Sequence, residues 1–181
     1  MAVLAKPETE EQRANVARMA MDIALLDPGS AAALRRGPLA GSGSAAFWKL
    51  MADHDIEAAR IAVWATVAQS IAILTPVGEG AGDPPRSAHD SGRSMGAALH
   101  HAGVSELRLA RLLAAGGHMR RNLVLRVCRR LARSRDHRRF DLRTLARAVV
   151  YCDEATDRQI ARDYYRAESA ARARDSHTRE E

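Results

Sequence analysis

The chain has 181 residues, of which 46% are apolar and only 4% aromatic. This length suits one compact domain or two small subdomains that share a core, and that core must consist mainly of alanine, leucine, valine and isoleucine. Because alanine, leucine and arginine favour helices and β-branched runs are few, the composition predicts an all-α protein. The longest apolar stretch, Ile61–Leu74, is too short to span a bilayer and is typical of a buried helix.

Positive charge is concentrated in one segment. Residues 104–147 contain 13 arginines and three acidic residues, whereas the whole chain has 28 basic and 22 acidic residues. A concentrated positive field of this kind suits a polyanion such as nucleic acid. Lysine occurs only at Lys6 and Lys49, so codon bias could raise the arginine count. It does not explain why acidic residues avoid this segment.

The spacing of apolar residues and the position of capping residues predict eight or nine helices and no strand. Together they would form a compact or two-lobed helical bundle. In the first half of the chain, the predicted helices cover residues 8–26, 30–36, a segment that follows Ser44, and about 55–74.

Residues 76–93 are rich in proline and glycine, and we expect a long mobile loop there. Beyond this loop, helices are predicted after Ser94, after Ser105, over about 118–133, after Asp141 and over about 153–168. We therefore expect three parts: an N-terminal helical bundle with part of the loop (1–85), a basic helical bundle (86–165) and a polar, disordered tail (166–181).

Four arginines share one face of the helix predicted over 118–133. At 100° per residue, they lie within an arc of about 100° opposite a broad apolar face. Such crowding costs free energy unless an anion or an acidic partner neutralises it. Four further arginines lie on the outer side of the preceding helix or at the turn between the two helices. The candidate contacts from this argument are Arg126, Arg129, Arg130 and Arg133 on the helix face, and Arg108, Arg111, Arg120 and Arg121 before it.

The bland alternative is a solvated surface with scattered ion pairs, but the nearby acidic residues are too few to pair most of these arginines. Phe140 is the only aromatic residue between Trp64 and Tyr151. Stacking on single-stranded bases requires interleaved aromatic residues, so we expect contacts with the nucleic-acid backbone that are independent of sequence and sensitive to salt.

No pattern points to an enzyme, a cofactor or a metal. The stretch Gly78–Asp83 resembles a phosphate-binding loop, but it lacks the Lys-Ser/Thr pair and a preceding strand. His100 and His101 point about 100° apart on a helix and cannot chelate one metal as a pair spaced by four would. Cys128 and Cys152 are expected to be buried thiols. The N-terminus lacks the pattern of a signal peptide, and we expect a cytoplasmic protein.

Several segments, in a fixed order and spacing, resemble one protein family. They are GSAAALRR (29–36), Phe47-Trp48, SMGAAL (94–99), SELRLARLL (105–113), VCRRL (127–131), FDLRTLARAVVY (140–151) and DRQIARDYY (157–165). Together they resemble the small subunit of the type I-E CRISPR Cascade surveillance complex, the CasB family. The resemblance extends from about Asp22 to Tyr165, and its specificity lies in the order of the segments.

The resemblance implies an all-helical, non-catalytic subunit that is present as two copies in a crRNA-guided complex with other Cascade subunits. Such subunits brace the crRNA–target heteroduplex and the displaced DNA strand through basic residues, while a separate helicase-nuclease cuts. Base pairing would read the sequence and the protein would hold the backbone of the R-loop. No membrane partner is implied.

Four arginines match basic positions of the family's motifs. Arg36 matches the second arginine of the first segment, Arg108 the arginine of the Ser-Glu-x-Arg motif, and Arg129 and Arg130 the paired arginines before leucine. A basic position of some members is Ala114 here, so one phosphate contact could be absent or supplied by Arg120 or Arg121.

A helix-turn-helix transcriptional regulator is the alternative interpretation. Residues 105–115, the Gly116-Gly117 turn and residues 118–133 could form two helices with a tight turn. Against it, the second helix carries arginines along its whole length and has few Asn, Gln or Ser to read base edges.

Overall fold

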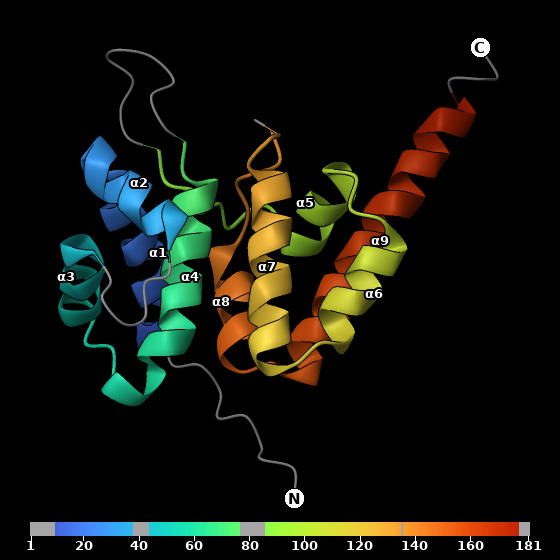
Figure 1. Cartoon of the computed structure of the whole chain (residues 1–181). Coiled ribbons are helices and arrows are strands. Elements are labelled where there is room, and N and C mark those ends of the chain that lie inside the picture. The colour runs from blue at the N-terminus through green and yellow to red at the C-terminus, as the bar shows by residue number, and fades with distance from the viewer. Residues whose placement is uncertain (1–9, 38–43, 77–85, 135, 178–181) are drawn as a thin grey trace, which may run out of the picture.

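The computed structural model describes residues 10–37, 44–76, 86–134 and 136–177, and these residues form nine α-helices and one short 3-10 helix (Figure 1). The described residues contain no strand apart from one isolated β-bridge. The all-α prediction is therefore confirmed. In chain order the helices are α1 (Glu10–Ala24), α2 (Pro28–Arg36), α3 (Ala45–Asp53), η1 (Ala58–Arg60), α4 (Ile61–Leu74), α5 (Met95–His101), α6 (Glu106–Ala114), α7 (Gly117–Leu131), α8 (Leu142–Val150) and α9 (Glu154–His177).

Helix α4 lies at the centre of the fold. Ten of its 14 residues are buried, because it packs against α1 and α2 on one side and against α7 and α8 on the other (Figure 1). Its buried side chains belong to one cluster that extends from Val16 in α1 to Tyr164 in α9. The core is thus continuous across residue 85, where the sequence suggested a boundary between two bundles. That division of the chain stays a prediction.

Helices α5 and α9 approach each other closely at Gly96. A Cβ atom at this position would meet the carbonyl oxygen of Ile160 and would lie 2.6 Å from the amide nitrogen of Tyr164. On the same helix, the Tyr164 hydroxyl donates a hydrogen bond of 2.6 Å to the carbonyl oxygen of Val104. Helix α9 therefore fixes both α5 and the residue from which α6 departs.

Helix α9 is longer than the sequence suggested. It continues to His177 and projects beyond the body of the molecule (Figure 1). The prediction of a disordered tail from residue 166 is therefore wrong for residues 166–177, and residues 178–181 lie outside the described part. An ion pair of 2.9 Å between Arg172 and Glu168, one helical turn apart, supports the projecting segment.

Local capping chemistry explains most helix starts. The predicted caps Ser44, Ser94 and Asp141 each accept a hydrogen bond from a backbone N–H of the first turn. Ser30 is not a cap. Asp27 takes this role and accepts from the Ser30 amide at 3.0 Å, because Pro28 can occupy the first position of a helix without losing a hydrogen bond.

The segment that follows the glycine- and proline-rich stretch is paired with a distant part of the chain. Residues 77–85 lie outside the described residues, but His89 forms a parallel β-bridge with Phe140. The Asp90 amide donates to the Phe140 carbonyl at 3.0 Å, and the Asp141 amide donates to the Arg93 carbonyl at 2.8 Å. The prediction of a mobile loop is therefore wrong for residues 86–93, and the pairing brings them beside residues 136–141.

Candidate nucleic-acid interface

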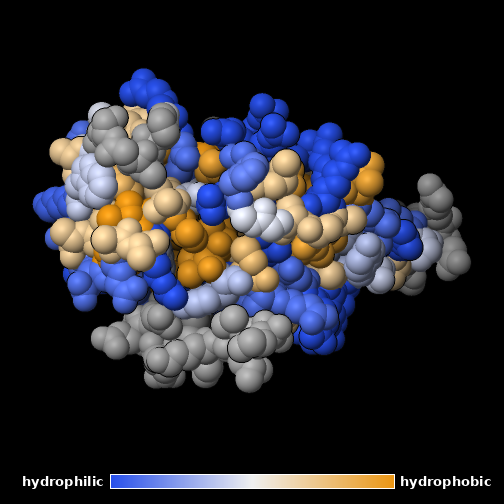
Figure 2. All heavy atoms as spheres, turned by 60° about the horizontal axis from the view of Figure 1, so that its bottom comes forward, coloured by the Kyte–Doolittle hydropathy of each residue, from blue (hydrophilic) through white to orange (hydrophobic). Residues whose placement is uncertain are grey.

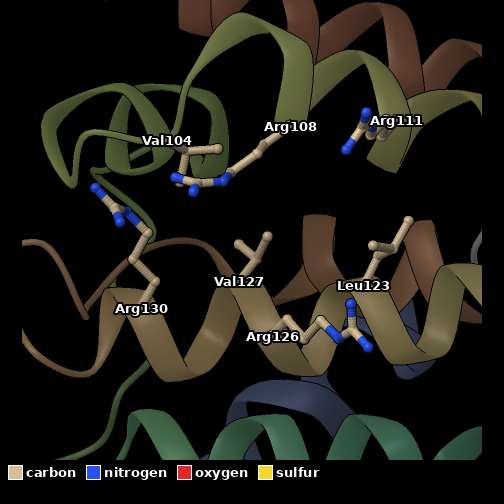
Figure 3. Close-up of a pocket in the computed structure, with 7 residues that line it drawn as sticks. All are labelled: Val104, Arg108, Arg111, Leu123, Arg126, Val127 and Arg130. Carbon is tan, nitrogen blue, oxygen red and sulfur yellow. The ribbon is translucent and has the colours of Figure 1, made fainter.

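Helices α6 and α7 enclose a groove of about 310 Å³ (Figure 3). Its floor is apolar and is formed by Val104, Leu123 and Val127. Two arginines from each helix line its walls. They are Arg108 and Arg111 from α6, and Arg126 and Arg130 from α7.

The sequence spacing of the two helices produces this groove. In α6, Leu109 and Leu112 are buried, while Arg108 and Arg111 precede them by one residue and are exposed. In α7, the residues Val124, Val127, Cys128 and Leu131 are buried. Each helix thus turns an apolar face to the core and an arginine face to the groove, as an amphipathic helix does.

Arg130 lines the groove and also forms hydrogen bonds with the backbone at the end of α5. Its Nε donates to the carbonyl oxygen of Ala102 at 3.0 Å, and its Nη2 donates to that of Gly103 at 2.7 Å. These carbonyls lie at the C-terminal end of α5, where helical carbonyls lack partners within the helix. Arg130 therefore satisfies this helix end while its charge stays at the edge of the groove.

Arg120 differs from the other arginines that were predicted to contact nucleic acid. The whole residue is 1% exposed, and its guanidinium forms a two-pronged ion pair with the Asp157 carboxylate of α9. The same group also donates to the carbonyl oxygens of Leu113 and Ala115, both at 3.4 Å. Arg120 holds the start of α7 to α6 and α9, and it is not available to a nucleic-acid phosphate.

The remaining predicted arginines lie outside the groove wall. Arg129 and Arg133 are exposed near the end of α7, and Arg121 is half-buried near its start. Arg36 is exposed at the end of α2, on the other side of α4 from α6 (Figure 1). Its neighbour Arg35 instead donates to the Ala72 carbonyl at 2.8 Å and so joins α2 to α4.

Sequence reasoning missed a second group of arginines. A recess of about 310 Å³ is lined by residues from both sides of the β-bridge, including Arg86, Arg93 and Arg139 together with the acidic Asp90 and Asp136. The two sides of this recess lie more than 40 positions apart in the sequence, as the hydrogen bond between Arg93 and the Asp136 carbonyl illustrates. The only signal was that Arg139 belongs to the arginine-rich stretch 124–139. Nothing in one sequence indicates that this stretch meets residues 86–93.

Other kinds of site find little support in the described residues. No group of three or more His, Cys, Asp or Glu side chains in them could hold a metal ion. Within the same residues, no helix is both long and apolar enough to cross a membrane. Burial raises the pKa of the Cys128 thiol to about 12. Cys152 is exposed, which corrects the prediction that both thiols are buried.

The chain is thus a small all-helical protein with an apolar core around one central helix, α4, and with a groove lined by arginines. The family CRISPR-associated protein Cse2 matches residues 30–165, which is most of the chain. The chain therefore belongs to the Cse2 family of CRISPR Cascade subunits, and the resemblance to the small subunit of the type I-E complex is confirmed. A search of curated proteins finds no match to the chain.

Proposed function

We propose that this Cse2-family subunit binds nucleic-acid backbone in the α6–α7 groove. It contacts the crRNA–target heteroduplex and the displaced DNA strand and so stabilises the R-loop. The observation that carries the proposal is the convergence of four arginines from two helices on one groove. The proposed contacts are the wall residues Arg108, Arg111, Arg126 and Arg130, with Arg129, Arg133, Arg121 and Arg36 as outlying contacts.

The groove suits the phosphate backbone better than the edges of the bases. Guanidinium groups form charge-assisted hydrogen bonds with phosphate oxygens, and a wall of four such groups binds without regard to sequence. Arg111 and Arg126 are exposed on opposite walls of the groove, where a phosphate can approach both. Guide pairing would supply the sequence specificity that the groove lacks.

The subunit acts within an assembly and has no catalysis of its own in this proposal. Its partners are the other Cascade subunits and a second copy of itself. Figure 2 shows one face of the molecule on which apolar surface reaches the solvent between hydrophilic side chains. The large exposed apolar side chains are Met21, Leu25, Trp48, Leu107, Met119 and Tyr165. Where such side chains adjoin one another, they are candidate contacts with a partner subunit.

The helix-turn-helix alternative finds less support. A recognition helix must enter the major groove with its outer face uncovered along several turns. Helix α7 packs against α4 on its buried side, and on its arginine side it shares a groove with α6. Arg126 and Arg130 therefore line a groove whose opposite wall is α6 (Figure 3), whereas a recognition helix would present them on an uncovered outer face.

The proposal is tested by the lifetime of the R-loop in the assembled complex. The chain is co-expressed with its genomic neighbours and a CRISPR array, either as wild type or with Arg111→Gln and Arg126→Gln together. Neither side chain supports the fold, so the variant should assemble normally. The matched control removes two charges elsewhere, with Arg18→Gln in α1 and Lys49→Gln in α3, both of which are exposed.

We expect the groove variant to release target DNA at least about tenfold faster than wild type at moderate salt, because about two phosphate contacts are lost. The control should keep the wild-type lifetime. If the groove variant holds target DNA as long as the control does, the groove is not the interface. Purification of the chain with one short duplex motif and no guide RNA would instead favour the helix-turn-helix regulator.

A further inference from the structure

A further recess of about 420 Å³ lies between the residues that precede and form α5 and the segment that follows α7. It adjoins the recess that contains Asp90 and Asp136, and the two share Arg93 and Arg139. Two arginines and two histidines line it, namely Arg93, Arg139, His101 and His137. None of them belongs to the α6–α7 groove, and the proposed function assigns no role to them.

Contacts with the backbone fix the two arginines in place. Arg93 donates to the carbonyl oxygen of Asp136, and its Nε lies 3.9 Å from the Asp90 carboxylate. Arg139 donates from Nε to the carbonyl oxygen of Ser87 at 3.1 Å. Both guanidiniums are therefore positioned before any ligand arrives, which lowers the entropic cost of binding.

The two histidines form a stacked pair. The ring centroids of His101 and His137 are 5.2 Å apart, and the ring planes differ by 27°. The centroid of the His100 ring lies 5.4 Å from that of His101, and the His100 ring contacts the Tyr164 ring of α9 at 5.3 Å. Imidazole side chains from α5 and from the segment after α7 thus meet at the wall of a recess that already contains two arginines.

The charges around His101 all oppose its protonation. Burial lowers the pKa of His101, and the neighbouring His137, His100, Arg174 and Arg93 lower it further. The carboxylate of Asp90 lies against Arg93. An anion in the recess would reverse this balance, because a negative charge stabilises the imidazolium form.

The recess and the groove lie at the two ends of one short segment of backbone. His101 lines the recess, Val104 lines the groove, and Arg130 binds the carbonyls of Ala102 and Gly103 between them. Three residues span at most about 11 Å. A nucleic-acid strand carries one phosphate per about 3.4 Å of duplex axis, so one strand can reach both places.

We propose that this recess is a second phosphate site, which binds the backbone of the strand held in the groove and takes up a proton on His101 as it does so. The inference rests on the proposed function, because it assumes a strand in the groove. It follows that the affinity for nucleic acid depends on pH. The complex with nucleic acid tightens as the pH falls through the range in which histidine titrates.

The test measures the protonation of His101 directly by NMR. The imidazole signals of the full chain are followed against pH, first alone, then with saturating single-stranded oligothymidylate, and then with inorganic phosphate. Oligothymidylate should raise the pKa of His101, and affinity for it should be at least about threefold higher near pH 6 than near pH 8. The variant with His101→Gln and His137→Gln should lose this difference and keep its affinity near pH 8.

The groove variant Arg111→Gln with Arg126→Gln separates this inference from the proposed function. It should bind oligothymidylate more weakly at every pH and retain the pH dependence. If the strand binds wild type and moves signals of the groove but leaves the pKa of His101 unchanged, the second site is refuted and the groove stands. If inorganic phosphate raises the pKa of His101 and oligothymidylate does not, the assignment of the recess to a strand is refuted. Absence of strand binding at low salt contradicts both proposals.

Discussion

Arg120 of α7 and Asp157 of α9 form an ion pair in the protein interior, with side chains that are 2% and 19% exposed. Both guanidinium Nη groups donate to the carboxylate, and Nη1 lies 3.0 Å from Oδ2. The pair joins the first turn of α7 to the first turn of α9 and closes one end of the groove-forming helices. An arginine that composition assigns to nucleic acid therefore serves the fold.

Breaking this pair should destabilise the protein. Asp157→Asn leaves the Arg120 charge buried without its counter-ion, and we expect the free energy of unfolding to fall by about 3 kcal/mol. Urea denaturation followed by circular dichroism measures the change. Arg158→Gln, at the exposed neighbouring position, is the control and should change stability by less than about 0.5 kcal/mol. Equal unfolding midpoints for the two variants would contradict the structural role of the pair.

Gly96 should tolerate no side chain. In Gly96→Ala the new methyl group meets the α9 backbone at Ile160 and Tyr164, and overpacking of this kind costs about 1–3 kcal/mol. Thermal denaturation would record the loss as a lower melting temperature. Gly92→Ala is the matched control, because its Cβ would meet only the Asp90 carboxylate at 3.4 Å. A Gly96→Ala protein as stable as this control would show that α5 and α9 are not in close contact.

The adjacent residues Arg129 and Arg130 should differ in their effect on stability. Arg130→Gln removes donors from the carbonyl oxygens of Ala102 and Gly103, which should cost about 1–2 kcal/mol. Arg129→Gln removes an exposed charge and should leave the unfolding midpoint unchanged. Both variants should weaken binding to nucleic acid. If Arg129→Gln proves the more destabilising of the two, the contact of Arg130 with α5 is wrongly assigned.

The two cysteines should react at very different rates in the folded protein. Burial raises the pKa of the Cys128 thiol to about 12, so the reactive thiolate is scarce at any pH below that value. Cys152 is exposed. Iodoacetamide near pH 8 should therefore modify Cys152 alone, as peptide mass spectrometry can establish. Modification of both residues in native protein, at the rates seen in urea, would contradict the burial of Cys128.

The features that sequence alone predicted depend on neighbours in the chain. Ser44, Ser94 and Asp141 cap helices because each is followed within three residues by an amide that it can accept from. The outward position of Arg108 and Arg111 follows from the spacing of Leu109 and Leu112. Helical geometry is enough to reach these conclusions.

The features that sequence alone missed depend on distant contacts. Arg120 and Asp157 are 37 residues apart, and the pairing of His89 with Phe140 joins segments 51 residues apart. Helical spacing does distinguish Arg120 from Arg121. Arg120 precedes Val124 by four residues and so lies on the buried face of α7, whereas Arg121 is rotated by about 100° and is half-buried. What sequence alone could not supply is the partner, because Asp157 of α9 lies 37 residues away in the chain.

The most direct test of the groove is the dependence of affinity on salt, because its slope counts the phosphate contacts. Affinity of the assembled complex for a single strand is measured against salt concentration, for wild type and for Arg111→Gln with Arg126→Gln. At about 0.7 per phosphate, loss of two contacts should flatten the log–log slope by about 1.4. The Arg18→Gln and Lys49→Gln control should keep the wild-type slope. Equal slopes for wild type and the groove variant would contradict the claim that the α6–α7 groove binds the backbone.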